Sequence, residues 1–128
     1  MRDLYSNIAA TLALAPAVQA AAATGATIDL QAARSVAFVV NTGAIVGDGD
    51  FGVTIQESDT TTSGDFANAA AAVIDTDAPE TLEAASSYRL GYRGFKRYVR
   101  LVLTKASGTS IAAGAVLIKG NAAEKPVA

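Results

Sequence analysis

The side chains that could do chemistry in this 128-residue chain are carboxylates, because it has no histidine and no cysteine. The chain therefore lacks the commonest general base, the commonest metal ligand and any thiolate nucleophile. Asp48 and Asp50 stand out in Gly47-Asp48-Gly49-Asp50, since carboxylate oxygens suit calcium. The twelve-residue EF-hand spacing, with its glycine and its terminal acidic residue, is not met. We interpret the motif as a hairpin turn that needs positive φ.

Other catalytic patterns are also missing from the sequence. Paired carboxylates can cleave glycosides, but here they lie in Ser- and Thr-rich loops without aromatic platforms for sugars. There is no Walker A motif and no Gly-x-Ser-x-Gly. We therefore expect no catalytic residues, no cofactor and no metal site. A ligand-binding module, for instance for host glycans, stays open as an alternative function.

A basic segment, Ser87–Thr104, is the first place to look for a partner. Its alternation predicts two strands joined by a tight turn at 93–96, with one apolar face and one face that carries arginines. Tyrosine and arginine are favoured at interface centres. We predict a docking face made of Arg89, Arg93, Lys96, Tyr98 and Arg100. The alternative is that these arginines are solvated and that the tyrosines are half-buried residues of the sheet. The inward set predicted for this segment is Tyr88, Leu90, Val99, Leu101 and Leu103.

Charge is segregated along the chain, although the net charge is only −2. Nine acidic and no basic residues lie between Ser35 and Tyr88, and six basic and no acidic residues lie from Arg89 to Lys105. One interpretation is that the fold mixes the two blocks in space. The other is that complementary patches dock identical or different subunits. We do not expect nucleic-acid binding, because a net-negative chain is a poor counterion-release surface.

Short alternating segments separated by turn residues predict an all-β fold, an antiparallel β-sandwich that is jelly-roll-like, with an N-terminal arm or short helix. Ser35–Asn41 is apolar on both faces, so we expect it to lie centrally or to face a neighbour. Phe66–Ile74 is either a short helix or an irregular edge strand. The predicted organisation is an arm over 1–23, a sandwich domain over 24–121 and a tail over 122–128.

The N-terminal segment Leu4–Ala23 is similar in composition to a secretory signal. Ser6, Asn7, Pro16 and Gln19 interrupt its apolar run, and it is too short and too interrupted to span a bilayer. We therefore expect no membrane interaction. We expect an arm, either two helical turns or extended chain, that packs on the domain or on a neighbour.

Several stretches resemble a family of small proteins encoded in tailed-phage structural gene clusters near the major capsid gene. They include MRDLYSNIAATLALAPAVQ, TIDLQ, SVAFVVNTG and FGVTIQESD. The most specific are Gln56-Glu57-Ser58-Asp59 and Gly91-Tyr92-x-Gly94-x-Lys96-Arg97-Tyr98-Val99-Arg100. The resemblance extends from about Asp3 to Gly120 and carries no catalytic residues. It implies a virion structural protein, made in the bacterial host cytoplasm and located on the capsid surface.

The expected function is capsid decoration, in which the chain binds the major capsid protein of a tailed phage as a cement protein. Many repeated weak contacts would then stabilise the shell through avidity. We also expect self-association, and a trimer would suit three-fold positions of a capsid. The alternative within the same particle is a tail-tube, head–tail connector or head-fibre base component.

Overall fold

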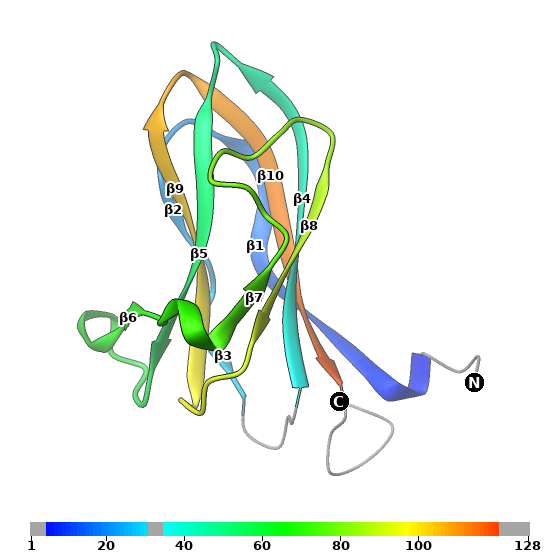
Figure 1. The fold of residues 1–128 in the computed structure, drawn as a ribbon, viewed down its shortest axis with the longest axis vertical. Helices are drawn as coiled ribbons and strands as arrows, with labels where there is room; N and C mark the ends of the chain where they lie inside the picture. Colours follow the sequence, from blue (N-terminus) through cyan, green and yellow to red (C-terminus); the bar gives the residue numbers. More distant parts are fainter. Residues whose placement is uncertain (1–4, 31–34, 121–128) are drawn as a thin grey trace.

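The computed structural model describes residues 5–30 and 35–120, which fold into two packed antiparallel β-sheets (Figure 1). The long strands follow the longest axis of the molecule, and the helical structure of these residues consists of three short 3-10 turns. The elements, in chain order, are η1 (Tyr5–Asn7), β1 (Ile8–Gln19), β2 (Ala23–Thr24), β3 (Ile28–Asp29), β4 (Ser35–Val46), β5 (Asp50–Ser58), η2 (Ser63–Asp65), β6 (Ala67–Asn68), η3 (Ala71–Val73), β7 (Ile74–Thr76), β8 (Ser87–Tyr92), β9 (Tyr98–Ser107) and β10 (Ser110–Gly120).

The strand order identifies the type of sandwich. The first sheet has the order β1-β10-β4-β8-β7, and the second sheet has the order β2-β9-β5-β6, with β3 also paired to β9. Apart from the short β3 and β7, the pairing is nested: β1 with β10, β2 with β9, β4 with β8 and β5 with β6. Nested pairing of eight strands over two sheets is jelly-roll topology. The predicted all-β, jelly-roll-like sandwich is therefore confirmed.

The core lies between the two sheets and is built by strict alternation on the long strands. Every residue of the predicted inward set of the basic segment is buried, and the core extends across both sheets. Its largest fully buried side chains are Phe38, Val40, Phe51, Ile55, Leu82, Val99, Leu101, Leu103, Ile111 and Leu117. Burying each such side chain contributes roughly 1.5–3 kcal/mol. The central position expected for Ser35–Asn41 is also observed, because β4 lies between β10 and β8.

The hairpin predicted for Ser87–Thr104 is wrong. Its two strands exist, but β8 pairs with β4 and β7 in the first sheet, whereas β9 pairs with β5 and β2 in the second. Residues 93–97 therefore cross from one sheet to the other. The reason is topological: nested pairing places most consecutive strands of a jelly roll in opposite sheets.

Two glycine turns close the other end of the sandwich. Gly47 and Asp48 have φ values of 62° and 54°, so the predicted positive φ is confirmed. The turn is not a hairpin within one sheet, however, because β4 and β5 belong to different sheets. Gly108, with φ of 86°, packs against it: a Cβ there would lie 2.6 Å from the Asp48 carbonyl oxygen. Gly47 and Gly108 therefore lie at positions that favour glycine, which adopts positive φ without steric strain.

The N-terminal segment is extended. β1 pairs with β10 from Ile8 to Gln19, so this segment is an edge strand of the first sheet, and only the single turn Tyr5–Asn7 is helical. Register shifts fall between Leu12 and Leu14 and between Leu14 and Ala17. Residues 1–4 of the predicted arm and the predicted tail over 122–128 lie outside the described residues. Across the described ranges, no helix has the length and apolar character needed to cross a bilayer.

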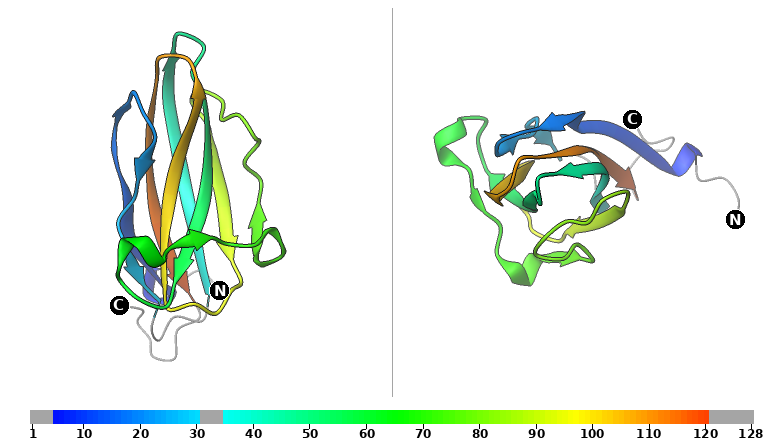
Figure 2. Two further views of the ribbon diagram at one scale, coloured as in Figure 1. Left: turned by 90° about the vertical axis from the view of Figure 1, so that its left-hand side faces the viewer. Right: turned by 90° about the horizontal axis from the view of Figure 1, so that it is seen from above.

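The Ala-rich segment Phe66–Ile74 is irregular edge structure, one of its two predicted alternatives. Its short strand β6 lies at the edge of the second sheet, and β7, which begins at Ile74, lies at the edge of the first. Residues 69–73 carry the chain between these edges along one side of the sandwich (Figure 2).

Candidate docking site

The five residues predicted to form one docking face lie in three different places. Arg89 lies on β8 and points outward from the first sheet. Tyr98 and Arg100 lie on β9 and point outward from the second sheet, on the opposite side of the sandwich. Arg93 and Lys96 lie in the β8–β9 connection, residues 93–97, at the end of the molecule away from the glycine turns (Figure 1). No single flat partner surface can contact all five.

The β8–β9 connection exposes an aromatic side chain that sequence reasoning did not select. Phe95 is 92% exposed, although phenylalanine is normally a core residue. The alternation that identified the strands on both sides of Phe95 gives no information about a residue in the connection. Its sequence neighbours, Gly94 and Lys96, could have indicated this exposure. They place Phe95 in a charged, glycine-containing turn, where a side chain has no adjacent strand on which to pack.

One side of the connection is fixed by Arg93. Its Nε donates to Asp75 Oδ2 at 2.7 Å and its Nη2 donates to Asp75 Oδ1 at 3.1 Å, a bidentate ion pair. The same Nη2 donates to the Ala72 carbonyl at 3.0 Å, and the Arg93 backbone N–H donates to the Val73 carbonyl at 2.7 Å. The connection is thereby attached to η3 and β7.

The other side is fixed by two further cations. Lys96 Nζ lies 2.8 Å from Asp59 Oδ2, and Arg97 donates to both oxygens of Asp29 at 3.0 and 2.9 Å. The hydrogen bond to Asp59 raises the pKa of Lys96, and that to Asp29 raises the pKa of Arg97. Each carboxylate therefore favours the charged form of its cation.

The side chain of Tyr92, at the end of β8, forms a hydrogen bond with the connection. The Tyr92 hydroxyl donates to Glu57 Oε1 at 2.5 Å and accepts from the Lys96 backbone N–H at 3.2 Å. Burial, and then the bond to Glu57, raise the pKa of Tyr92 above its ordinary value of 10.0. Gly94 packs directly on the Tyr92 ring, where a Cβ would collide with it. Tyr92 thus joins β8 of the first sheet to β5 of the second, and it also holds the β8–β9 connection through Lys96.

The ion pairs also decide how the charge blocks are arranged. Arg89 pairs with Asp77 at 3.1 Å, as Arg93 does with Asp75 and Lys96 with Asp59, so three residues of the basic block contact the acidic block within one chain. The interpretation that the fold mixes the two blocks in space is confirmed. A docking role for the acidic block on a neighbouring subunit can no longer rely on these three carboxylates being free of partners.

Arg100, on the outward side of the second sheet, is bonded to neighbouring side chains of its own chain. Its Nε donates to Gln56 Oε1 at 2.8 Å, its Nη1 donates to Ser63 Oγ at 3.1 Å, and its guanidinium lies 4.2 Å from the centroid of the Phe66 ring. The Arg97 guanidinium lies 5.1 Å from the centroid of the Tyr98 ring. Arg100 therefore holds the 63–66 segment on the sheet.

The carboxylates considered for calcium have ordinary roles in this fold. Asp48 occupies the positive-φ turn, and Asp50 accepts a hydrogen bond from Thr81 Oγ1 at 2.7 Å. Within residues 5–30 and 35–120, no three Asp, Glu, His or Cys side chains gather as a metal site would require. The candidate site that stands out among the described residues is the exposed Phe95 on its hydrogen-bonded connection.

Comparisons with known proteins do not extend this description. No protein-family model, no curated protein and no solved structure matches the chain. A jelly roll is shared by viral capsid domains, lectins and cupins, so the topology by itself does not select a function. Function has to be inferred from the chain's own surface.

Proposed function

We propose that this chain is a virion structural protein of a tailed phage, a capsid decoration protein that binds the major capsid protein shell and stabilises the head. The observation that carries the proposal is Phe95, which is 92% exposed at the tip of a connection held by Arg93–Asp75, Lys96–Asp59 and Arg97–Asp29. An exposed phenylalanine forgoes the burial energy that this side chain usually contributes, and a partner that covers it would recover that energy. The same connection belongs to the block that most resembles phage particle proteins.

The bracing of the connection supports binding for an energetic reason. Ordering a flexible loop at an interface costs affinity, and a loop that is already fixed avoids that cost. Aromatic anchors that fill a pocket on the partner carry a large part of the binding energy at an interface. The cations around Phe95 are matched by carboxylates, so we expect the shell protein to present an apolar pocket with a polar rim.

The location of the chain in its particle tests the proposal. Particles of the phage that encodes it are separated into heads and tails, and the chain is quantified in each by mass spectrometry. Decoration requires many copies on the heads and density on the outer shell in an electron-microscopy map. A chain found only in tails, or as a few copies at the neck, would replace decoration by the tail-tube, connector or head-fibre base role. A glycan array tests the sugar-binding alternative.

The contribution of Phe95 has a matched control in the same chain. Heads that lack the decoration protein are incubated with purified wild-type chain or with Phe95→Ala, and the bound copies are counted after sedimentation. We expect Phe95→Ala to weaken binding roughly 10- to 30-fold, as for loss of an interface anchor. Tyr5→Ala removes an aromatic residue that is 90% exposed, and should bind normally. Equal occupancy by Phe95→Ala and wild type would overturn the assignment of the site.

A further inference from the structure

The outward surface of the first sheet is aliphatic along the middle of three adjacent strands, with polar Ser35 and Asn41 at the outward positions on either side in β4. Neighbouring positions on β1, β10 and β4 lie opposite one another, as in Leu12–Val116–Val39 and Ala10–Ile118–Ala37. They alternate along each strand with buried residues such as Leu117 and Phe38, so they face away from the core. We call this surface the aliphatic face; its residues are Ala10, Leu12, Val18, Ala37, Val39, Ala112, Val116 and Ile118.

The aliphatic face carries no charge. β1 and β4 contain no charged residue, and the single charged residue of β10, Lys119, is out of phase with the outward positions. Leu12 is 54% exposed and Val18 is 70% exposed on β1. Contiguous apolar patches on the surface of a folded domain often mark interaction surfaces.

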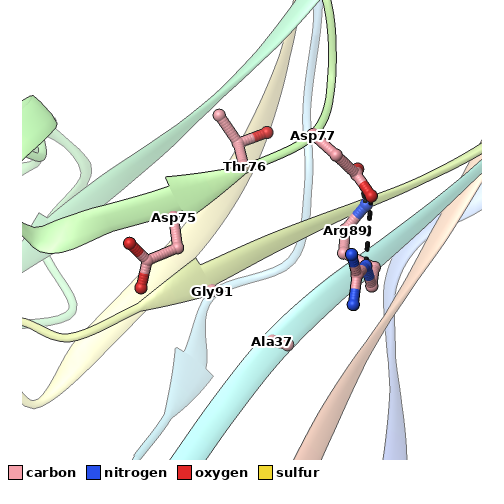
Figure 3. A pocket seen from close by; sticks show the side chains of 6 residues that line it. All are labelled: Ala37, Asp75, Thr76, Asp77, Arg89 and Gly91. Carbon is pink, nitrogen blue, oxygen red and sulfur yellow. Dashed lines mark hydrogen bonds and ion pairs between the residues drawn. The ribbon is translucent and has the colours of Figure 1, made fainter.

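A shallow hollow adjoins the aliphatic face on the side of β8 and β7, across the sheet from β1. It has a volume of about 330 Å³, and small residues, Ala37 of β4 and Gly91 of β8, form its floor (Figure 3). Asp75 and Thr76 of β7 border it, together with the Arg89–Asp77 ion pair. The same sheet thus presents an apolar projection on β1, Leu12, and a depression at β8.

We propose that the aliphatic face packs against the same face of a second copy of this chain. A two-fold axis parallel to the strands, between β10 and β4, places β1 of each copy over β8 of the other. By the register of the sheet, Ala10 of each copy then lies over Gly91 in the hollow of its partner, and Leu12 lies over Arg89 at the edge of that hollow. The contact is isologous, so each of these two pairings occurs twice in the dimer.

A second copy fits this face for reasons of charge. A two-fold contact brings each side chain close to copies of its own neighbours, so a face with charges of one sign would repel itself. The aliphatic face has none, and its border at β7 and β8 has both signs side by side in Arg89–Asp77 and Arg93–Asp75. A partner with one sign of charge would gain nothing from this border.

The size of the face is also adequate. Strands of 12, 12 and 11 residues make up β1, β4 and β10. With about 3.3 Å per residue and about 4.8 Å between strands, the whole outward surface of these strands, of which the aliphatic face is the central part, covers roughly 500–600 Å². Together with the border at β8 this reaches roughly 600 Å² per copy, the lower end of the range for specific interfaces.

Sedimentation equilibrium of the purified full chain across the micromolar range tests the proposal. We expect wild type to approach twice the chain mass of 12.9 kDa. Leu12→Lys removes the projection at an exposed position, and Gly91→Val fills the hollow; each should weaken self-association roughly 30-fold or more. At Gly91 a Cβ would meet only Asp75, at 3.7 Å or more, so the fold should tolerate the change. Circular dichroism and the melting temperature check that both variants fold.

A matched control separates this face from the other one. Val102 lies on the middle of β9 and faces outward from the second sheet, as Val116 does from the first. Val116→Lys should give monomer, whereas Val102→Lys should keep the mass of wild type. A monomeric wild type, a trimer, or folded Leu12→Lys that still dimerises would overturn the proposal. These measurements use the isolated chain, so their outcome is independent of whether the chain binds phage heads.

Discussion

The two outward faces of the sandwich are built on similar strands but have different chemistry. On the second sheet, Gln56 lies beside Arg100 and Asn68, and its amide bonds to both. On the first sheet, the corresponding central positions are Val39 and Val116, with no polar partner on the same row until Arg89. These polar side chains face solvent on the second sheet and form hydrogen bonds with one another. The first sheet has aliphatic side chains at these positions, which is why we propose it as a surface that binds protein.

This difference teaches that an exposed arginine is weak evidence for a docking site. The arginines of the basic segment are tied to carboxylates, an amide and a hydroxyl of their own chain. Exposed pairs of this kind contribute little to stability, and their donors are already used. Leu12, Val18 and Phe95 have no such partner to satisfy, and their exposure is the stronger indication of an interface.

The largest expected change in the free energy of unfolding separates the inward and outward positions of the second sheet, at two neighbouring residues of β9. Leu101 is fully buried, and Leu101→Ala should lower the free energy of unfolding by roughly 2–5 kcal/mol, because it leaves a cavity. Val102→Ala, one position along and facing outward, should cost less than about 1 kcal/mol. Chemical denaturation of both variants measures the difference. Equal losses would mean that the outward face of the second sheet is not solvent-exposed as described.

The inward positions of the strands could be predicted from sequence, because alternation alone defines them. Tyr88, Leu90, Val99, Leu101 and Leu103 are all buried as expected. The pairing of the strands could not be predicted the same way, since β8 and β9 look like a hairpin when only local sequence is considered. A jelly roll separates them, and with them the arginines expected to share one face.

The candidate site was predicted even less completely. Arg93 and Lys96 lie in the connection that we propose as the docking site, but Phe95 was missed, because exposure in a loop leaves no periodic signal. The aliphatic face was missed for another reason. Val39 and Val116 read as ordinary strand residues, and sequence alone does not reveal that both lie on the outward side of the same sheet.

The next largest change in stability is expected from the Tyr92–Glu57 hydrogen bond, which joins the two sheets. Tyr92→Phe removes the hydroxyl that bonds Glu57, so a partly buried carboxylate loses its donor. We expect a loss of about 1–3 kcal/mol at neutral pH, as for a hydrogen bond to a charged group. Urea denaturation measures this loss. The matched control is Tyr98→Phe on the outward side of the second sheet, for which we expect a smaller change.

Alkaline pH offers a second test of the same tie. The pKa of Tyr92 is raised in the folded chain above its ordinary 10.0, so the folded state holds this proton more tightly than the unfolded state does. The corresponding stabilisation is complete below pH 10 and is lost as the pH rises beyond it. The melting temperature of wild type should therefore fall above pH 10 more steeply than that of Tyr92→Phe. Parallel curves would contradict the assignment. Ultraviolet titration should also show one of the four tyrosines ionising last.

A smaller effect separates two arginines that face outward on opposite sheets. Arg100→Ala removes bonds to Gln56 and Ser63 and the contact with the Phe66 ring, and should cost about 1 kcal/mol. Arg89→Ala removes a side chain that is 79% exposed, and should change the free energy of unfolding much less. Thermal denaturation in low and high salt distinguishes them, because screening should weaken the Arg89 pair while leaving the neutral contacts of Arg100 largely intact. The reverse order would indicate that the border of the aliphatic face is structural.

The smallest effect lies at that border, in Asp77. The Arg89 backbone N–H donates to Asp77 Oδ1 at 2.7 Å, and this bond, followed by the Arg89 side chain, lowers the pKa of Asp77 below its ordinary 3.8. A lowered folded pKa means that the stabilisation is present above pH 3.8 and is lost as the pH falls through the folded value. Asp77→Asn keeps an oxygen for the backbone bond but cannot titrate, so its melting temperature should fall slightly less than that of wild type between about pH 5 and pH 2. A large difference would show that the ion pair, rather than the aliphatic residues beside it, determines how this edge of the first sheet is held.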